Sequence, residues 1–570
     1  MSTASAGPAS IISLPTAGGA LRGIGESFRP DPHTGAGTVT VPITVPRGRN
    51  GFQPDLSLVY STGNGNGYFG LGWRLSIAGV SRKTSRGVPR YSDADTFVLS
   101  GAEDLVLVDA AANAYRPRTE GMFARIVRHL GTSHDFWEVR SRDGLTTFYG
   151  TNPSAAPAYP TGWDVAGDMA VTARPGAGGD VFAWQPTLST DPYGNRIEYL
   201  YRRDRSGAGD QPMLGEIRYA DYGTRFLVTV TFEYEDRPDP FSDHRAGFEI
   251  RTSRRCRAIT VRTDTDEVRR ARQFTFAYAA DPLNGVSLLR EVSVHGFDDQ
   301  DAPVTELPPL SFGYTSFAPL RRELVPVTGP DPPPLAVGSR NCEQVDLSGG
   351  GLPDVLQLDR HTARYWRNLG GGRFDRPREM PEAPGGLALA DTGVQLVDAD
   401  GDGRADLLVT RDGVAGYFPL RFGGQWDHRS FRRYTAAPTF GLEDPDVKLV
   451  DLDGDGRTDA IRSGTRMECY FNDADPAKAW RRTRSVARRS LEVFPDVTFS
   501  DPRVRWADMT GDGLQDIVLV YDRNVEYWPN QGHGDWGRRV HLTDGPRLPY
   551  GYDPARLLLG DVDGDGLADL

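Results

Sequence analysis

Apolar and polar positions alternate along much of the first 300 residues. Residues 38–45 read Thr-Val-Thr-Val-Pro-Ile-Thr-Val, and Leu56–Tyr60 resumes the alternation after the Pro- and Gly-containing stretch 46–51. Since successive side chains of a strand point to opposite faces, this pattern predicts two strands joined by a turn. Similar runs predict further strands at 96–100, 182–188, 226–234 and 273–278. No apolar pattern of helical period is sustained over three turns, so we expect an all-β N-terminal region.

The last 230 residues contain an internal repeat. Five nine-residue loops begin with an aspartate and share Asp and Gly positions, and each is named here by its first residue: loops 346, 398, 451, 508 and 561. Four of them are followed by an apolar stretch and an aromatic pair, namely Tyr365-Trp366, Tyr417-Phe418, Tyr470-Phe471 and Tyr527-Trp528.

A repeat of about 50 residues with short strands and a recurrent aromatic has the size of a β-propeller blade. One such unit cannot bury its own apolar face, so the units are expected to stack. Four full repeats and the start of a fifth are visible, and the sequence stops one residue after Asp569. We therefore expect an incomplete propeller in a truncated sequence.

A proline-rich stretch separates the two patterns. Residues 325–334 read Val-Pro-Val-Thr-Gly-Pro-Asp-Pro-Pro-Pro, and consecutive prolines do not enter a sheet interior. The predicted organisation is a disordered start at 1–11, a β-rich shell domain at 12–324, a linker at 325–336 and propeller repeats at 337–570.

The Asp loops predict calcium binding. Aspartates at loop positions 1, 3, 5 and 9, with glycines at 4 and 6, resemble EF-hand loops and the FG-GAP or VCBS repeats. Ca²⁺ takes six to eight oxygens, and glycines allow the sharp turn that brings alternate side chains to one point. The candidate ligands are Asp398, Asp400, Asp402, Asp406, Asp451, Asp453, Asp455, Asp459, Asp508, Thr510, Asp512, Asp516, Asp561, Asp563, Asp565 and Asp569.

The loops differ in their ligand sets. Loop 508 has Thr510 at position 3, which still offers an oxygen, whereas loop 346 has Ser348 and Gly350 in place of the central carboxylates. Loop 346 is therefore expected to keep only the turn. The alternative for all five is an Asx-turn hairpin without an ion. A fully coordinated Ca²⁺ would be structural and would stiffen a blade edge.

Charge and composition exclude several classes of protein. The formal net charge is −12, which disfavours nucleic acid as a partner. Three widely spaced cysteines, Cys256, Cys342 and Cys469, predict buried free thiols rather than a disulfide framework. The N-terminus has no signal-peptide pattern, and no apolar run is long enough to cross a bilayer. We expect synthesis in the bacterial cytoplasm, no direct membrane insertion, and an extracellular destination reached without a signal peptide.

Catalytic motifs are absent from the sequence. Phosphate loops, HExxH, GxSxG and histidine pairs at metal spacing are not found, and His33 lies in a turn-like stretch. Glu233-Tyr-Glu235 matches the ExE pair of arginine-specific ADP-ribosyltransferases, but two same-face acids in a strand arise readily by chance. The prediction is that the chain is not an enzyme.

The N-terminal residues resemble the SpvB N-terminal family, which the SpvB virulence protein shares with the B components (TcaC/TcdB-like) of insecticidal toxin complexes. The resemblance rests on the segments 12–20, 24–28, 34–35, 41–43, 48–52, 54–61, 67–75, 81–84 and 99–105. It is looser up to residue 330, where Asp191–Tyr219 also resembles a YD repeat of the Rhs type. The Asp-loop region resembles the propeller of the same B components.

This resemblance implies a non-catalytic scaffold. In toxin complexes, the B component and an Rhs-type C component form a hollow β-shell around a toxic polypeptide, and the propeller docks on the A-component channel. The alternative is the N-terminal part of an SpvB-like ADP-ribosyltransferase whose catalytic domain lies outside this sequence. An integrin-like adhesion propeller, suggested by the loops alone, would predict a signal peptide.

Overall fold

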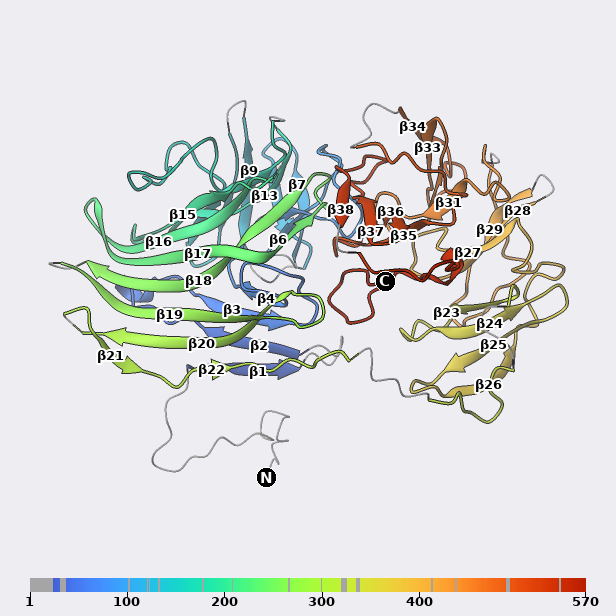
Figure 1. Ribbon diagram of the computed structural model, residues 1–570. Coiled ribbons are helices and arrows are strands. Elements are labelled where there is room, and N and C mark those ends of the chain that lie inside the picture. The colour runs from blue at the N-terminus through green and yellow to red at the C-terminus, as the bar shows by residue number, and fades with distance from the viewer. Residues whose placement is uncertain are drawn as a thin grey trace, which may run out of the picture.

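The structure is a computed structural model that describes residues 24–30, 37–100, 103–119, 121, 123–131, 134–176, 179–207, 209–264, 267–298, 300–318, 325–334, 339–411, 414–435, 438–487, 493–542 and 545–570. The predicted disordered start at 1–11 lies outside these residues. The described chain is built from strands, with two short 3-10 helices at Arg49–Gly51 and Pro554–Arg556. The N-terminal unit (24–318) and the repeat region (339–570) lie side by side (Figure 1).

The N-terminal unit begins with a small antiparallel sheet. Its strands are β1 (Ser27–Pro30), β2 (Gly37–Pro42), β3 (Ser57–Ser61) and β4 (Trp73–Leu75). The alternation found at 38–60 is confirmed, because β2 and β3 pair in register from Thr38–Ser61 to Pro42–Ser57.

A second, larger sheet fills the rest of this unit. Its strands are β5 (Val80–Arg82), β6 (Phe97–Leu99), β7 (Glu103–Asp109), β8 (Ala114–Pro117), β9 (Arg125–Leu130), β10 (Asp135–Arg140), β11 (Thr146–Tyr149), β12 (Val171–Ala173), β13 (Val181–Trp184), β14 (Pro186–Thr190), β15 (Arg196–Asp204), β16 (Gln211–Tyr222), β17 (Arg225–Asp243), β18 (Ile250–Asp264), β19 (Val268–Ala280), β20 (Ser287–Phe297), β21 (Pro303–Glu306) and β22 (Leu310–Ser311). Long strands from β15 to β20 pair sequentially and antiparallel.

The two sheets of the N-terminal unit share a core. Val41 and Leu58 of the small sheet are fully buried in one cluster with Ile217, Val230 and Ile259 of the long strands. The short strands β5 to β11 pair in order, β11 pairs β14, and β13 pairs β5. Only one residue separates β13 from β14, so the series of paired strands that starts at β5 leads back to β5. These strands contribute a second hydrophobic core.

The repeat region folds into four antiparallel four-stranded sheets, as the propeller-blade prediction requires. The first blade contains β23 (Cys342–Val345), β24 (Asp354–Leu358), β25 (Ala363–Asn368) and β26 (Phe374–Glu379), and the second contains β27 (Val394–Val397), β28 (Asp406–Arg411), β29 (Val414–Phe418) and β30 (Arg432–Arg433). The third contains β31 (Val447–Val450), β32 (Asp459–Arg462), β33 (Arg466–Phe471) and β34 (Arg482–Ala487). The fourth contains β35 (Val504–Ala507), β36 (Asp516–Tyr521), β37 (Asn524–Trp528) and β38 (Val540–Leu542). The fifth Asp loop follows, closed by a bridge between Gly560 and Asp569.

Apolar side chains join each blade to the next. Leu356 and Leu407 belong to one buried cluster, Leu408 and Ala460 to a second, and Ile461 and Ile517 to a third. The aromatic pairs of the repeat lie in the third strand of each blade, and Trp366, Tyr417 and Trp528 are at most 2 % exposed. Stacking of the units therefore buries the faces that a single unit would leave in water.

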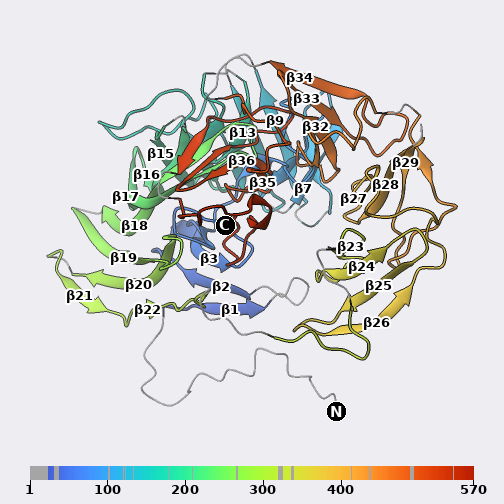
Figure 2. The ribbon, with the colours of Figure 1, turned by 45° about the vertical axis from the view of Figure 1, so that its right-hand side comes forward.

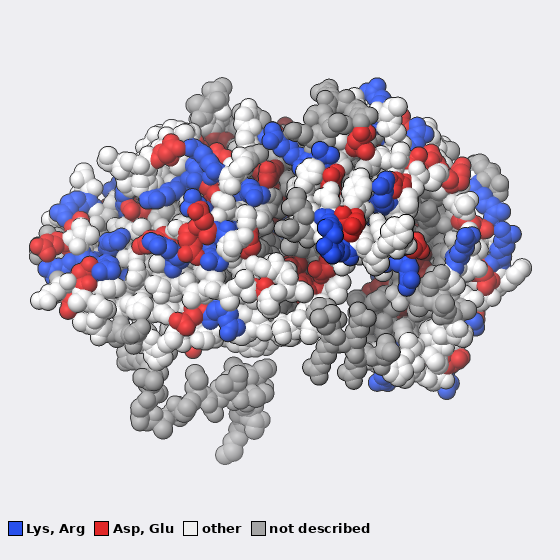
Figure 3. All heavy atoms as spheres, viewed as in Figure 1, with Lys and Arg blue, Asp and Glu red and all other residues white. Residues whose placement is uncertain are grey.

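The blades follow one another around the repeat region in chain order (Figures 1 and 2). The last two blades, drawn in orange and red, lie against the N-terminal unit, while the first two lie away from it. Thr328, in the stretch predicted as a linker, pairs with Arg373 of the first blade. On the face shown in Figure 3, Lys and Arg side chains are interspersed with Asp and Glu.

The three cysteines are buried and free, as predicted. Within the described part of the chain, no helix combines the length and the apolar character needed to cross a membrane.

Candidate functional site

The first aspartate of each Asp loop folds the turn. In loop 398, Asp398 Oδ1 accepts the N–H of Gly401 at 2.7 Å and Oδ2 accepts the N–H of Gly403 at 2.7 Å. Both glycines have φ of +80°, a conformation that a side chain would strain. Asp346, Asp451, Asp508 and Asp561 accept backbone N–H groups in the same way. These bonds are Asx turns, the feature that the alternative without an ion also contains.

The ninth aspartate joins the loop to the blade. Asp406 Oδ2 accepts the N–H of Ala399 at 3.1 Å and its Oδ1 accepts the N–H of Leu420 at 2.9 Å. Equivalent pairs of bonds form at Asp354, Asp459 and Asp516. Because loop 346 has this pairing without central carboxylates, the ninth aspartate stabilises the turn whether or not an ion binds.

Three loops bring carboxylates together. The described residues form groups with ligand atoms within 4.8 Å of one another at Asp398–Asp400–Asp406, Asp451–Asp453–Asp459 and Asp561–Asp563–Asp565. The candidate ligands Asp402, Asp455 and Asp569 lie outside these groups, and loop 508 supplies none. A fourth group, Glu382, Asp427 and His428, lies outside the loops, and Asp427 is ion-paired with Arg421.

The third loop position carries a buried oxygen without a hydrogen-bond partner in three successive loops. These atoms are Asp400 Oδ1, Asp453 Oδ1 and Thr510 Oγ1. A buried polar atom with no partner costs about 1–3 kcal/mol, so its recurrence at one position needs an explanation. A cation held between positions 1, 3 and 9 would satisfy these oxygens. The residues present therefore fit a hard divalent cation.

Burial raises the pKa values of the ninth aspartates. Burial, followed by the nearby carboxylates of the loop, raises the pKa of Asp406 to about 7 and that of Asp516 to about 8. Burial and Asp453 hold the pKa of Asp459 well above its ordinary value. A bound cation would favour the ionised forms, so the loops are suited to exchange protons for a metal ion.

The third-position carboxylates also have cationic neighbours. Asp400 Oδ2 contacts Arg432 of the same blade at 2.9 Å. Asp453 Oδ2 contacts Arg482 of its own blade, His533 Nδ1 at 3.3 Å and Arg90 of the N-terminal unit at 3.8 Å. All these contacts use Oδ2, which leaves Oδ1 of Asp453 buried without a hydrogen-bond partner.

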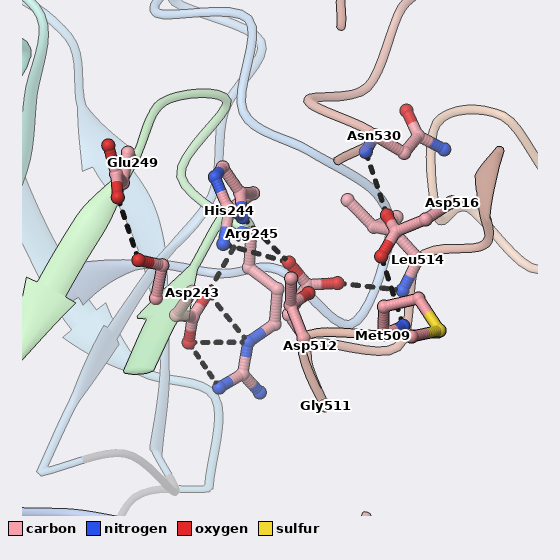
Figure 4. Close-up of polar contacts among 12 residues, drawn as sticks. Asp243, His244, Arg245, Glu249, Met509, Gly511, Asp512, Leu514, Asp516 and Asn530 are labelled. Atoms are coloured by element: carbon pink, nitrogen blue, oxygen red, sulfur yellow. Dashed lines mark hydrogen bonds and ion pairs between the residues drawn. The ribbon is translucent and has the colours of Figure 1, made fainter. Parts of the chain in front are cut away.

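Three loops contact the N-terminal unit, a feature that the sequence did not predict. The backbone N–H of Val88 donates to the Asp453 carbonyl at 2.7 Å. Figure 4 shows His244, whose backbone N–H donates to Asp512 Oδ2 at 2.8 Å. Asn284 Nδ2 donates to Asp563 at 3.0 Å and to Asp565 at 2.7 Å. No local pattern marks these residues, because each partner is more than 250 residues away.

The ExE pair of the N-terminal unit is engaged in ion pairs. Glu233 contacts Arg257 at 3.0 Å and Glu235 contacts Arg255 at 2.6 Å, both across the β17–β18 pairing. These contacts give both acids a structural role in the sheet. His33 lies outside the described residues.

Two family models match the chain. The SpvB family, "Salmonella virulence plasmid 65kDa B protein", matches residues 31–232 and 215–261, and the FG-GAP-like repeat matches residues 346–409 and 508–570. Mono(ADP-ribosyl)transferase SpvB of Salmonella choleraesuis (strain SC-B67) is 28 % identical over 321 residues, which cover 44 % of this chain and 50 % of that protein. The SpvB protein of Salmonella typhimurium is 28 % identical over 320 residues with the same coverage.

Solved toxin structures resemble the whole chain. A chain of the Photorhabdus luminescens Tc holotoxin pore (mutation TccC3-D651A) superposes with a TM-score of 0.80 and 26 % identity, covering 99 % of this chain and 29 % of that one. The crystal structure of TcdB2-TccC3 gives a TM-score of 0.59 at 22 % identity, covering 98 % and 32 %, and so shows the fold alone. The matches span about half the length of the curated relatives and a third or less of the toxin chains. The chain thus contains a segment that matches the SpvB family model and segments that match the FG-GAP-like repeat model, and its fold matches that of a Tc holotoxin chain.

Proposed function

We propose that this chain is part of the B component of a bacterial insecticidal toxin complex and acts as a non-catalytic scaffold. Its N-terminal unit would help an Rhs-type C component enclose a toxic polypeptide, and its repeat region would dock on the A-component channel. It would act outside the cell after synthesis in the bacterial cytoplasm. The observation that carries the proposal is the superposition of 99 % of the chain on a Tc holotoxin chain at a TM-score of 0.80.

The alternative is an SpvB-like ADP-ribosyltransferase. Its support is the match to the Salmonella proteins of that name, which covers 44 % of this chain. The repeat region favours the scaffold, because the superposition on a Tc holotoxin chain includes the blades and the loop residues resemble structural cation ligands rather than a transferase site. The ion-paired Glu233 and Glu235 likewise favour a structural role for the ExE pair.

Reconstitution tests the scaffold proposal. The protein would be mixed with the C and A components of a toxin complex and analysed by size-exclusion chromatography, and its NAD⁺ consumption would be measured separately, without the C component. A stoichiometric complex without NAD⁺ turnover is expected, and Glu233→Gln should leave both results unchanged. NAD⁺-dependent labelling of a target protein by this gene product, without any complex, would overturn the scaffold and favour the transferase.

A structural role for Ca²⁺ is the second part of the proposal. Loops 398, 451 and 561 would hold an ion through their grouped carboxylates, and loop 508 would do so through Thr510 in place of a carboxylate. The unpartnered buried oxygens at position 3 support this proposal. Metal analysis of the chain dialysed against Ca²⁺ should find about three to four ions per chain, with none from loop 346. Retention of no Ca²⁺ at millimolar concentration would contradict it.

A further inference from the structure

Only part of the Asp-loop series faces the N-terminal unit. In loop 398 the third-position carboxylate, Asp400, contacts Arg432 of the same blade. Loops 451, 508 and 561 instead offer a carboxylate oxygen from position 3 or 5 to a donor of the N-terminal unit. The donors are Arg90 for Asp453, the His244 N–H for Asp512, and Asn284 for Asp563 and Asp565.

The loop carboxylates that face the N-terminal unit at loops 451 and 508 are buried, whereas the Arg90 side chain is 54 % exposed. The Asp453 side chain is 2 % exposed, and the side chains of His244 and Asp512 are 4 % and 1 % exposed. Low exposure strengthens these polar contacts and makes their loss costly. Their geometry depends on where the loop holds its position-3 and position-5 carboxylates.

At Asp453 the two carboxylate oxygens have separate surroundings. Oδ2 receives Arg90, Arg482 and His533, whereas Oδ1 is buried without a hydrogen-bond partner, and Asp453 groups with Asp451 and Asp459. A cation on Oδ1 and the N-terminal unit on Oδ2 would therefore bind the same carboxylate together. Without a cation, carboxylates within 4.8 Å repel one another and are driven either to protonate or to separate.

We propose that cations bound in loops 451, 508 and 561 hold the N-terminal unit against the repeat region. This inference rests on the proposed Ca²⁺ binding and adds its consequence: the ions fix the loop carboxylates in the positions that Arg90, His244 and Asn284 recognise. Cavities of about 590 Å³ beside Thr510 and about 470 Å³ beside Asp563 and Asp565 give solvent access to two of these loops.

Coupling of this kind is reciprocal. If a bound ion stabilises the contact between the two parts, the contact must raise the affinity for the ion by the same factor. Substitutions of donors in the N-terminal unit should therefore weaken Ca²⁺ binding although they remove no metal ligand.

Hydrogen–deuterium exchange of the full chain, followed by mass spectrometry, tests the proposal. The Val88 and His244 amides donate across the interface, so peptides containing them report the contact directly. Exchange of these peptides should be about tenfold faster in EGTA than in Ca²⁺, since tenfold corresponds to a modest change in opening equilibrium. Asp400→Asn serves as the control, because it should lose one ion in loop 398 without changing exchange at Val88 or His244.

Calorimetric titration with Ca²⁺ provides the reciprocal test. Asn284→Ala, which removes a neutral donor to Asp563 and Asp565, should weaken part of the Ca²⁺ binding about fivefold. Arg254→Ala, which removes an exposed ion pair with Asp236, should leave it unchanged. If the chain binds Ca²⁺ but neither the exchange nor the affinities respond, the coupling is wrong and Ca²⁺ binding stands. If no Ca²⁺ binds at all, the proposed metal role itself fails.

Discussion

The backbone N–H of His244 donates to the Asp512 carboxylate at 2.8 Å, although the two residues are 268 positions apart in the sequence. His244 Nδ1 lies 3.7 Å from the same oxygen, and both side chains are buried. Burial alone would raise the pKa of Asp512, but the hydrogen bonds from His244 and Leu514 hold it below its ordinary value. The contact therefore places an ionised carboxylate at the boundary between the N-terminal unit and the repeat region.

A neighbouring contact depends on a glycine. Gly87 has φ of +106°, and a Cβ at this position would lie 2.8 Å from the Asp453 carbonyl oxygen. Gly87→Ala is expected to strain the backbone and to push the 86–90 segment from loop 451, at a cost of about 1–3 kcal/mol. Thermal unfolding and exchange of the Val88 peptide would measure this effect.

Gly194→Ala is the matched control for this substitution. Gly194 also has a positive φ of +83°, but no heavy atom lies within 4 Å of the added Cβ. It should therefore show the backbone strain without the effect on the Val88 peptide. Equal exchange of that peptide in the two variants would argue against a close fit between Gly87 and loop 451.

The ninth aspartate should stabilise a blade without help from a metal ion. Asp354→Asn in loop 346 turns one of two acceptors into a donor that faces a backbone N–H of Leu347 or Asn368. One buried hydrogen bond is lost and one N–H is left unpaired, so we expect a destabilisation of about 1–3 kcal/mol. The melting temperature should fall by the same amount in Ca²⁺ and in EGTA. A fall confined to the Ca²⁺ sample would mean that loop 346 binds an ion after all.

Much of this architecture follows from local sequence. Alternation at 38–60, the five Asp loops and the buried aromatic pairs predicted the strands, the blade repeat and the stacked core, because each pattern describes neighbours in the chain. The pairing of Val80 with Trp184 could not be predicted in this way. Such pairings depend on the closure of the whole sheet, and one alternating strand fits many partners equally well.

The candidate site likewise contains residues that local sequence could predict and residues that it could not. The loop residues that fold the turn, such as Asp398 and Gly401, could be assigned by position within the motif. Arg90, His244 and Asn284 lie in segments with no motif, and their role depends on how two separately folded parts meet. The sequence also did not separate the ninth aspartates, which bind backbone N–H groups, from the third-position residues with unpartnered oxygens.

Acid should destabilise the N-terminal unit through Asp239. Burial opposes ionisation of this carboxyl, but hydrogen bonds from Arg237 and Ser287 outweigh it and lower the pKa of Asp239 to about 2. A carboxyl with a lowered folded-state pKa stabilises the fold above its ordinary pKa of 3.8, and this stability is lost as the pH falls from about 4 to 2. The contribution is on the order of 1–2 kcal/mol.

Asp239→Asn isolates this contribution. The variant should be less stable than the wild type at pH 7, and the difference should shrink as the pH approaches 2, as measured by thermal unfolding. Asp236→Asn is the control, because the Asp236 side chain is 84 % exposed and contacts only the exposed Arg254 among the ion pairs of the described residues. A constant difference between wild type and Asp239→Asn across this pH range would show that the Asp239 carboxylate does not contribute through its charge.

Loop 508 should bind Ca²⁺ more weakly than its neighbours for a reason that one substitution can correct. Its third position is Thr510, whose Oγ1 is buried without a partner, and its other carboxylates do not form a group as close as those of loops 398 and 451. Thr510→Asp adds a charged oxygen at this position and should tighten binding at this loop by about tenfold, since ligand charge sets Ca²⁺ affinity. Thr510→Val keeps the shape but removes the oxygen, so it should abolish binding there while the remaining loops bind as before. Calorimetric titration of the three proteins would resolve the weakest class of sites. If all three gave the same isotherm, loop 508 would hold no ion, and its contact with His244 would rest on the Asp512 carboxylate alone.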